Sequence, residues 1–177
     1  MASLKEVFIY DAVRTPRGKG RADGNHSTIR PVKLAAHVIE SLVKRQDLSP
    51  QVLEEELEDI ILGCVTQVGE QGGCIAKAAA LESGVPESVS GVTVNRFCAS
   101  GLEAINLAAA RIKCDQNPLL IAGGVESMSR MPMGTDGGAL MMDPHTANLG
   151  GYIPQGVAAD LIANLKRYAR RDLDQWA

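Results

Sequence analysis

Short apolar runs alternate with segments of helical periodicity over the first 124 residues of the chain. The run "DIILGCV", residues 59–65, is almost wholly apolar, as expected of a parallel strand that is covered on both faces. Strands are also predicted, from their β-branched and apolar residues, at "EVFIYDAV" (6–13), "GVTV" (91–94) and "PLLIAGG" (118–124). Because helical segments separate these runs, the pattern predicts an α/β fold with a mostly parallel sheet and right-handed crossover helices.

Helices are predicted where apolar residues recur every three or four positions. One begins at Pro31, which lacks only an amide that has no partner in a first helical turn. A short acidic helix begins at Pro50, with Ser49 as its N-cap. An alanine-rich helix covers 74–84 and closes at a glycine, and a further helix begins near Cys98.

The character of the chain changes after Gly124. Residues 125–156 hold many glycines and prolines, most of the methionines and little periodicity, which predicts a long irregular loop region. Helical spacing returns from Val157 through Leu165. We therefore expect an N-terminal α/β domain at 1–124, followed at 125–177 by the beginning of a loop region and a C-terminal helix.

Composition and charge argue against several classes of function. The 177 residues carry 18 Lys and Arg against 21 Asp and Glu, so the chain lacks the positive field that nucleic acids and membrane surfaces usually require. The apolar run near the N-terminus ends at Asp11, which is too short for a secretory signal or a membrane span. These features predict a cytoplasmic protein that binds neither nucleic acid nor membrane.

The four cysteines are predicted to be reduced thiols, because a disulfide framework is a feature of secreted chains. They are Cys64, Cys74, Cys98 and Cys114, and no two of them are spaced as Cys-x-x-Cys. A zinc site is therefore not expected. For Cys64, Cys74 and Cys114, the favoured interpretation is an ordinary structural role.

Cys98 lies where the predicted strand at 91–94 passes into a helix. In a parallel sheet, unpaired amides and the positive ends of helices converge beyond the carboxyl ends of the strands, where ligands bind. This environment favours the thiolate, which is the form that attacks a carbonyl carbon. The backbone amide of Cys98 could also face the oxygen of a tetrahedral intermediate.

Three points about Cys98 stay open at this stage. Ser100 and Glu103 form a Ser-x-x-Glu capping box, which would start the helix at Gly101 and leave Cys98 in the preceding turn. By position alone, catalysis and burial as a small apolar residue suit Cys98 equally well. Cys74 is its one rival as a nucleophile, since "EQGGC" also places a thiol at the start of a helix.

Four segments of the chain resemble the thiolases, and they occur in the family's order. They are "DAVRTPRGKG" (11–20), "VNRFCASGLEAINLAA" (94–109), "AGGVESMSRMPMG" (122–134) and "IPQGVAADLIA" (153–163). The second resembles the family's nucleophile segment, and the third resembles its glycine-rich segment. The residues of these four segments resemble those of the acetyl-CoA acyltransferases, including degradative 3-ketoacyl-CoA thiolases, more closely than those of the ketosynthases.

The resemblance implies a thiolase-like N-terminal half in which Cys98 is acylated during transfer between a 3-ketoacyl chain and coenzyme A. It implies that the Cys98 amide contributes to an oxyanion hole and that Glu126 has a supporting role, although a carboxylate satisfied by loop amides is as compatible. The Met-rich region from Met128 to Met142 would begin the loop that shapes the acyl tunnel, or serve as adaptable packing. Coenzyme A is implied as a substrate, with no cofactor and no metal.

Two family motifs do not occur in these residues. Thiolases supply their bases from a histidine in a Gly-His-Pro context and from a second cysteine in a Cys-x-Gly context. His26, His37 and His145 do not precede a Gly-Pro pair or stand in that context. The sequence therefore resembles an N-terminal portion that is incomplete for catalysis.

Other functions remain as alternatives. A ketosynthase-like condensing enzyme also has a cysteine at a helix start, and a half-fold could act as a non-catalytic binding or assembly module. No Gly-x-Gly-x-x-Gly follows a strand, which argues against dinucleotide binding. A half-sandwich would leave one apolar face uncovered, so we expect a homo-oligomer or pairing with a complementary C-terminal half.

Overall fold

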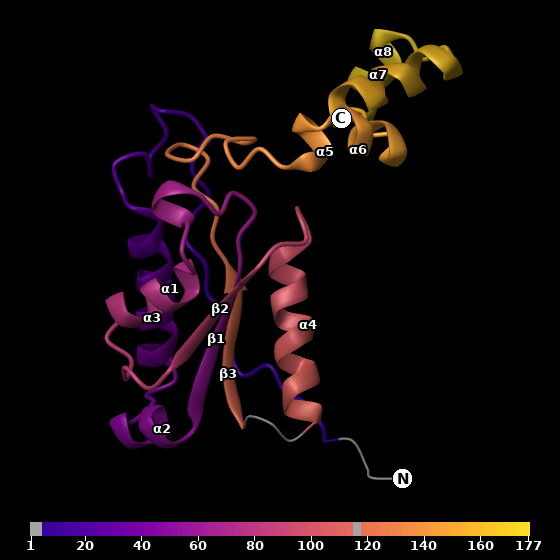
Figure 1. Cartoon of the computed structure of the whole chain (residues 1–177). Coiled ribbons are helices and arrows are strands. Elements are labelled where there is room, and N and C mark those ends of the chain that lie inside the picture. The colour runs from indigo at the N-terminus through magenta and orange to yellow at the C-terminus, as the bar shows by residue number, and fades with distance from the viewer. Residues whose placement is uncertain (1–4, 115–117) are drawn as a thin grey trace. The chain divides into compact units, whose positions relative to one another are not determined.

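The computed structural model describes residues 5–114 and 118–177. The chain divides into two compact units, Met1–Asp136 and Gly137–Ala177. The first unit contains the sheet and the second contains helices alone (Figure 1). The expected boundary after Gly124 lies at the end of the strand Leu119–Gly124, twelve residues before the end of the first unit, and the assignment of functional domains stays a prediction.

The sheet of the first unit has three parallel strands in the order β2-β1-β3. They are β1 (Leu57–Gly63), β2 (Ser90–Val94) and β3 (Leu119–Gly124). Ile61 of β1 is paired with Val92 on one side and with Ala122 on the other. The three strands and their parallel direction confirm the α/β prediction for the runs at 59–65, 91–94 and 118–124.

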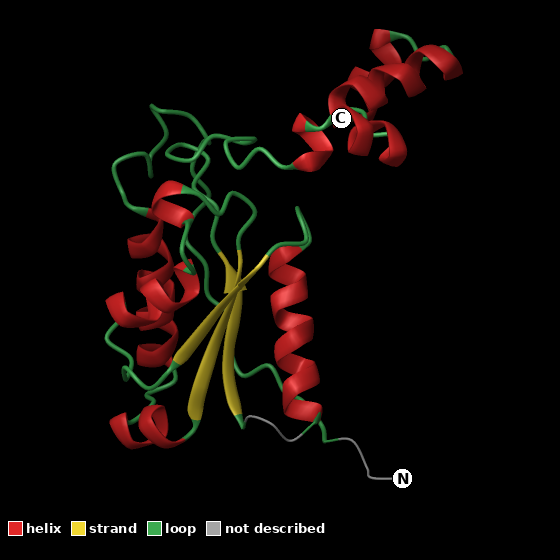
Figure 2. Ribbon diagram, viewed as in Figure 1, coloured by secondary structure: helices red, strands yellow, loops and turns green. Residues whose placement is uncertain are grey.

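Helices cover both faces of the sheet, as Figure 2 shows. One face carries α1 (Pro31–Arg45) and α3 (Ile75–Glu82), and the other carries α4 (Ser100–Lys113). The short α2 (Pro50–Glu55) and the 3-10 turn Gly69–Gln71 lie before and after β1 in the chain. Since both faces of β1 are covered, its apolar side chains are buried along almost their whole run.

Two apolar clusters form the core, one on each face. Ile60 is fully buried against residues of α1 and α3, among them Ile39, Ala76 and Ala79. Ile61, also fully buried, packs against Ala104 and Ala108 of α4. Alanines at the contacts let helix and sheet approach closely, so a core with few aromatic side chains is still filled.

The local signals for the first helices are confirmed. Pro31 is the first residue of α1, and Pro50 is the first residue of α2. The Ser49 hydroxyl accepts a hydrogen bond from the Val52 amide at 3.2 Å, which is the N-cap contact that the sequence predicts. These features depend on neighbouring residues only, and so they can be recognised without the tertiary structure.

The prediction of a strand at 6–13 is wrong. This segment has no strand in the structure, and its apolar side chains are exposed, with Phe8 at 63%, Ile9 at 79% and Tyr10 at 78%. The order β2-β1-β3 leaves the outer edges of β2 and β3 open, and residues 6–13 form no strand on either of them. β-Propensity alone therefore did not decide the state of this segment.

The second unit is entirely helical. It contains α5 (Ala139–Met142), α6 (Pro144–Gly150), α7 (Gln155–Lys166) and α8 (Arg170–Trp176), and none of their residues is buried. The predicted helical spacing through Leu165 is confirmed by α7, whereas the irregular region before it holds two short helices that periodicity did not indicate. Within residues 5–114 and 118–177, no helical segment has the length and hydrophobicity of a membrane span.

Candidate active site

The loops that follow the three strands meet beyond the carboxyl ends of the sheet, next to the first turn of α4 (Figure 2). Cys98 lies in the loop between β2 and α4, and its side chain is exposed. The structure thus brings the predicted nucleophile to this end of the sheet, two residues before α4 begins at Ser100. Glu126 lies in the loop after β3, at the same end.

The loop that carries Cys98 is held by its own hydrogen bonds. The Asn95 side chain accepts from the Phe97 amide at 2.8 Å and donates to the Val65 carbonyl at 3.2 Å, which ties the loop to the segment after β1. Phe97 has a φ of 48°, a conformation that is costly for a residue with a side chain. The surrounding contacts hold the residue immediately before Cys98 in this conformation.

The predicted capping box is wrong in its detail. Ala99, and not Ser100, precedes the helix, and it makes no side-chain cap. The Ser100 hydroxyl instead turns back into the loop, where it accepts from the Arg96 amide at 2.8 Å and donates to the Phe97 carbonyl at 2.5 Å. Glu103 pairs with the Arg96 guanidinium at 3.0 Å. Both side chains therefore stabilise the loop that carries Cys98.

The backbone amide of Cys98 has no recorded acceptor among the described residues. The next two amides are engaged, since Ala99 donates to the Arg96 carbonyl at 3.1 Å and Ser100 donates to the Phe97 carbonyl at 2.9 Å. A free amide beside an exposed sulfur is what an oxyanion-binding nucleophile requires. The geometry is thus compatible with the role predicted for this amide.

The other three thiols lie in different surroundings. Cys64 is buried, with 1% of its surface exposed. Cys74 is half-buried, and its sulfur donates to the Gly91 carbonyl at 3.2 Å. Cys114 is exposed at the carboxyl end of α4, the end opposite to Cys98. The two exposed thiols therefore lie at the two ends of one helix, where the helix dipole has opposite signs.

Burial raises the pKa of the Cys64 thiol to about 12, and the negative charge of Glu126 and a hydrogen bond to it act in the same direction. A thiol with such a pKa stays protonated at neutral pH and is a poor nucleophile. Cys64 is thus an inert structural thiol, as the sequence predicts.

The carboxylate of Glu126 is satisfied by neighbouring loops. One oxygen accepts from the amides of Val65 at 2.8 Å and Thr66 at 3.3 Å, and the other accepts from the Gln71 side chain at 2.8 Å. These bonds link the loop after β3 to the segment after β1. None of the recorded hydrogen bonds of Glu126 involves the Cys98 loop, so the structure does not place the two predicted residues in direct contact.

Gln71 is a buried polar residue that the sequence analysis missed. It is fully buried, and its Nε2 donates to the Thr66 carbonyl at 2.9 Å as well as to Glu126. Its Oε1 accepts from the Ser127 amide at 2.6 Å. From the sequence, a glutamine in the glycine-rich stretch "GEQGG" would be expected to be exposed to solvent. It is buried only because the loop after β3 packs against it.

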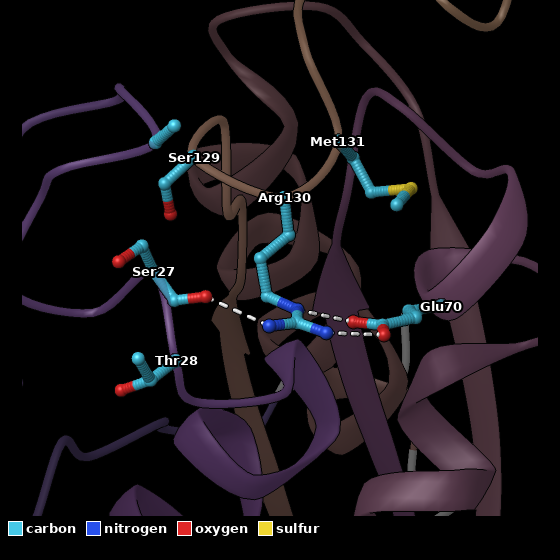
Figure 3. A pocket seen from close by; sticks show the side chains of 7 residues that line it. Ser27, Thr28, Glu70, Ser129, Arg130 and Met131 are labelled. Atoms are coloured by element: carbon cyan, nitrogen blue, oxygen red, sulfur yellow. Dashed lines mark hydrogen bonds and ion pairs between the residues drawn. The ribbon is translucent and has the colours of Figure 1, made fainter.

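Arg130 joins three loops beside a cavity of about 450 Å³ (Figure 3). Its guanidinium makes two hydrogen bonds of 2.6 Å to the carboxylate of Glu70 and one of 2.7 Å to the Ser27 carbonyl. Hydrogen bonds from Arg130 lower the pKa of Glu70. Ser129 and Met131 also line this cavity. Because the Arg130 guanidinium is already hydrogen-bonded to Glu70 and Ser27, this cluster serves to hold these segments together.

A larger groove of about 1580 Å³ follows β3 and includes Glu126, Met128 and residues of the 5–20 segment in its lining. Cys98 lines neither this groove nor the smaller cavity. His26 borders the larger groove and is hydrogen-bonded to the Pro16 carbonyl at 2.8 Å. No histidine among the described residues makes a hydrogen bond to the Cys98 sulfur.

The described residues thus form a parallel α/β unit with an exposed cysteine just before a helix, at the end of the sheet where such folds bind ligands. The family model for the N-terminal domain of thiolase matches residues 7–177. The chain therefore belongs to the thiolase family.

Curated relatives agree with this assignment. A beta-ketoadipyl-CoA thiolase of Pseudomonas aeruginosa is 42% identical over 98% of this chain and 46% of its own length. A 3-ketoacyl-CoA thiolase of Aeromonas hydrophila is 36% identical, with 98% and 44% covered. The chain thus spans about half the length of the curated relatives it matches.

A solved structure is similar as well. The acetyl-CoA acetyltransferase of Bacillus anthracis is 38% identical to this chain, with a TM-score of 0.55 over 62% of this chain and 26% of that one. The similarity supports the thiolase-like fold of the described α/β unit.

The raised pKa of Cys64 predicts how the free energy of unfolding changes at alkaline pH. The folded protein holds the thiol proton more tightly than the unfolded chain, whose thiol titrates near its ordinary value of 9.0. This contribution to stability is complete below about pH 9 and is lost as the pH rises toward 12, with a slope of at most about 1.4 kcal/mol per pH unit.

The test compares urea unfolding of the wild type and Cys64→Ala at about pH 8 and about pH 10. The variant loses packing at both pH values, but its free energy of unfolding should fall less steeply between them. Cys114→Ala is the matched control, because it removes an exposed thiol. Parallel pH dependence in the wild type and Cys64→Ala would contradict the prediction.

Proposed function

We propose that Cys98 is the acyl-accepting cysteine of a thiolase that transfers an acyl group between a 3-ketoacyl-CoA and coenzyme A. The observation that carries this proposal is the place of Cys98, exposed beside its own free amide at the start of α4 in a chain of the thiolase family. Relatives named for thiolase activity on acyl-CoA thioesters support the reaction class.

The chemistry follows from the nucleophile. The Cys98 thiolate adds to the C-3 carbonyl of the 3-ketoacyl-CoA, and the negative charge on oxygen is stabilised by the Cys98 amide. Collapse of this intermediate breaks the bond between C-2 and C-3, and protonation of C-2 releases acetyl-CoA. The thiol of coenzyme A then attacks the cysteine thioester, releases a shortened acyl-CoA and regenerates Cys98.

This cycle requires groups that move protons, and the two motifs that carry them in thiolases do not occur in these residues. We propose that these residues supply the acyl-accepting part of the site and that a complementary C-terminal portion supplies the bases. Glu126 would support the site from the side of β3 by holding the segment after β1 through Val65 and Thr66. No cofactor is part of the proposal, and coenzyme A enters as substrate.

We also propose that the α/β unit associates with a second copy or with a complementary half, in the cytoplasm, where its thiols would stay reduced. The outer side of α4 supports association, because Leu102 is 61% exposed and Ile105 is 42% exposed. These apolar side chains are on the helix that Cys98 precedes, so association there would exclude water close to the proposed site.

The first test of the proposed nucleophile compares two thiols on one helix. At neutral pH and low salt, iodoacetamide should label Cys98 faster than Cys114 by about fivefold, because the amides at the start of α4 stabilise the negative charge of an attacking sulfur and the carbonyls at its end do not. Peptide mass spectrometry gives the two rates in one sample. Cys64 and Cys74 serve as slow internal controls, and equal rates for Cys98 and Cys114 would contradict activation.

The second test measures transfer itself. Incubation with acetoacetyl-CoA or acetyl-CoA should leave one acetyl group on Cys98, detected by intact mass and peptide mapping. The adduct should vanish in Cys98→Ala and persist in Cys114→Ala. Steady-state thiolysis of acetoacetyl-CoA by these residues alone should be negligible, since the proton-moving motifs are missing. Acetyl transfer to a different cysteine would overturn the assignment of Cys98. Robust steady-state thiolysis would overturn the proposal that a C-terminal portion supplies the bases.

The third test concerns association. Sedimentation velocity of the wild type should show a dimer or a larger species, and Leu102→Glu should shift it toward monomer, because a charge at the apolar contact is costly to bury. Leu81→Glu is the matched control, since Leu81 is 52% exposed on α3, on the other face of the sheet. A wild type that is monomeric at all concentrations would contradict the proposal.

A further inference from the structure

We infer that Gly63, the last residue of β1, is a positioning residue for Cys98, because the first turn of α4 lies where a side chain would be. An ideal Cβ on Gly63 would lie 2.3 Å from the carbonyl carbon of Ser100 and 2.5 Å from the amide nitrogen of Gly101. Both atoms are backbone and cannot swing aside as a flexible side chain can. This inference rests on the proposed function, since it names what holds the proposed nucleophile in place.

Glycine is required at position 63 because there is no space for a side chain, and not because of the backbone conformation. Its φ lies outside the left-handed region that favours glycine, so any residue could adopt its backbone geometry. Its carbonyl accepts a hydrogen bond from the Val125 amide at 3.0 Å. The strand end therefore cannot retreat from α4 without breaking the link to the segment after β3.

A second glycine completes the contact. An ideal Cβ on Gly124, at the end of β3, would lie 2.9 Å from the Gly63 carbonyl oxygen and 3.6 Å from the Gly101 Cα. The start of α4 thus packs directly on the ends of two neighbouring strands. A methyl group on Gly124 would disturb the same contact less severely than one on Gly63.

Ser100 connects the contact between Gly63 and α4 to the loop that carries Cys98. Ser100 is 4% exposed, and its hydroxyl holds the Arg96 amide and the Phe97 carbonyl on the two sides of the loop. If a methyl group on Gly63 displaced the Ser100 backbone, those two bonds would move with it. The position of the sulfur and of its free amide relative to the first turn of α4 would then change.

A matched glycine separates positioning from stability. Gly91, in β2, packs as tightly against α3, where an ideal Cβ would lie 2.4 Å from the Lys77 amide nitrogen and 2.6 Å from its Cα. A methyl group there should cost a comparable amount of stability on the opposite face of the sheet. The Cys98 loop makes no recorded contact with Lys77 among the described residues, so the reactivity of Cys98 should be insensitive to Gly91→Ala.

The experiment measures two quantities in the wild type, Gly63→Ala, Gly124→Ala and Gly91→Ala. The first is the ratio of iodoacetamide labelling rates of Cys98 and Cys114, expected to fall from about fivefold toward unity in Gly63→Ala, to fall less in Gly124→Ala, and to persist in Gly91→Ala. The second is amide hydrogen exchange at Glu103 in α4 and at Ala78 in α3, which donate to Ala99 and Cys74. Gly63→Ala should lower protection at Glu103, and Gly91→Ala at Ala78.

Each outcome decides the question. An unchanged labelling ratio in a folded Gly63→Ala overturns the inference, as does an equal loss in Gly91→Ala. If Gly63→Ala does not fold, the milder Gly124→Ala decides by the same ratio. If Cys98 of the wild type reacts no faster than Cys114, the proposed function fails. Hydrogen exchange at Glu103 then shows separately whether the two glycines hold the first turn of α4.

Discussion

Strand β1 is covered on both faces, with Ile60 buried against α1 and α3 and Ile61 buried against α4. The two neighbouring side chains point to opposite faces, so each helical layer has its own apolar anchor on the same strand. Removing either side chain from water stabilises one layer by roughly 1.5–3 kcal/mol. Parallel pairing to β2 and β3 then brings the carboxyl ends of all three strands together, and every group of the candidate site lies in the loops beyond them.

Those loops hold two thiols in opposite surroundings, one buried and one exposed. Cys64 directly follows the last residue of β1, and Cys98 lies four residues after the end of β2. Cys64 lies inside, beside the Glu126 carboxylate, and its pKa is raised to about 12. Cys98 lies outside, before the first turn of α4, with an amide that has no recorded acceptor among the described residues. Burial and neighbouring charge, and not residue type, therefore separate a structural thiol from the proposed nucleophile.

The site is tied together by backbone and amide contacts and by few ion pairs. Gln71 and Glu126 connect the segment after β1 to the loop after β3, and the Asn95 side chain connects the Cys98 loop to Val65. The Ser127 amide and the Val65 carbonyl in these links belong to loops beyond the strand ends, where ladder partners run out, and Gln71 meets Glu126 through its side chain. The glycine at the end of β1 then lets α4 approach the sheet closely. Such contacts fix distances well, which suits a site whose chemistry depends on where one sulfur lies.

The sequence by itself determined the helix starts at Pro31 and Pro50, the N-cap at Ser49, the three described strands and the place of Cys98 before a helix. All of these depend on residues close together in the chain, where propensity, capping and periodicity act. Tertiary structure alone decided that residues 6–13 stay outside the sheet, although the outer edges of β2 and β3 are open. It also buried Gln71 next to Glu126, 55 positions away in the chain. Those outcomes depend on contacts between segments that are far apart in the sequence. Residue type and spacing alone do not predict such contacts.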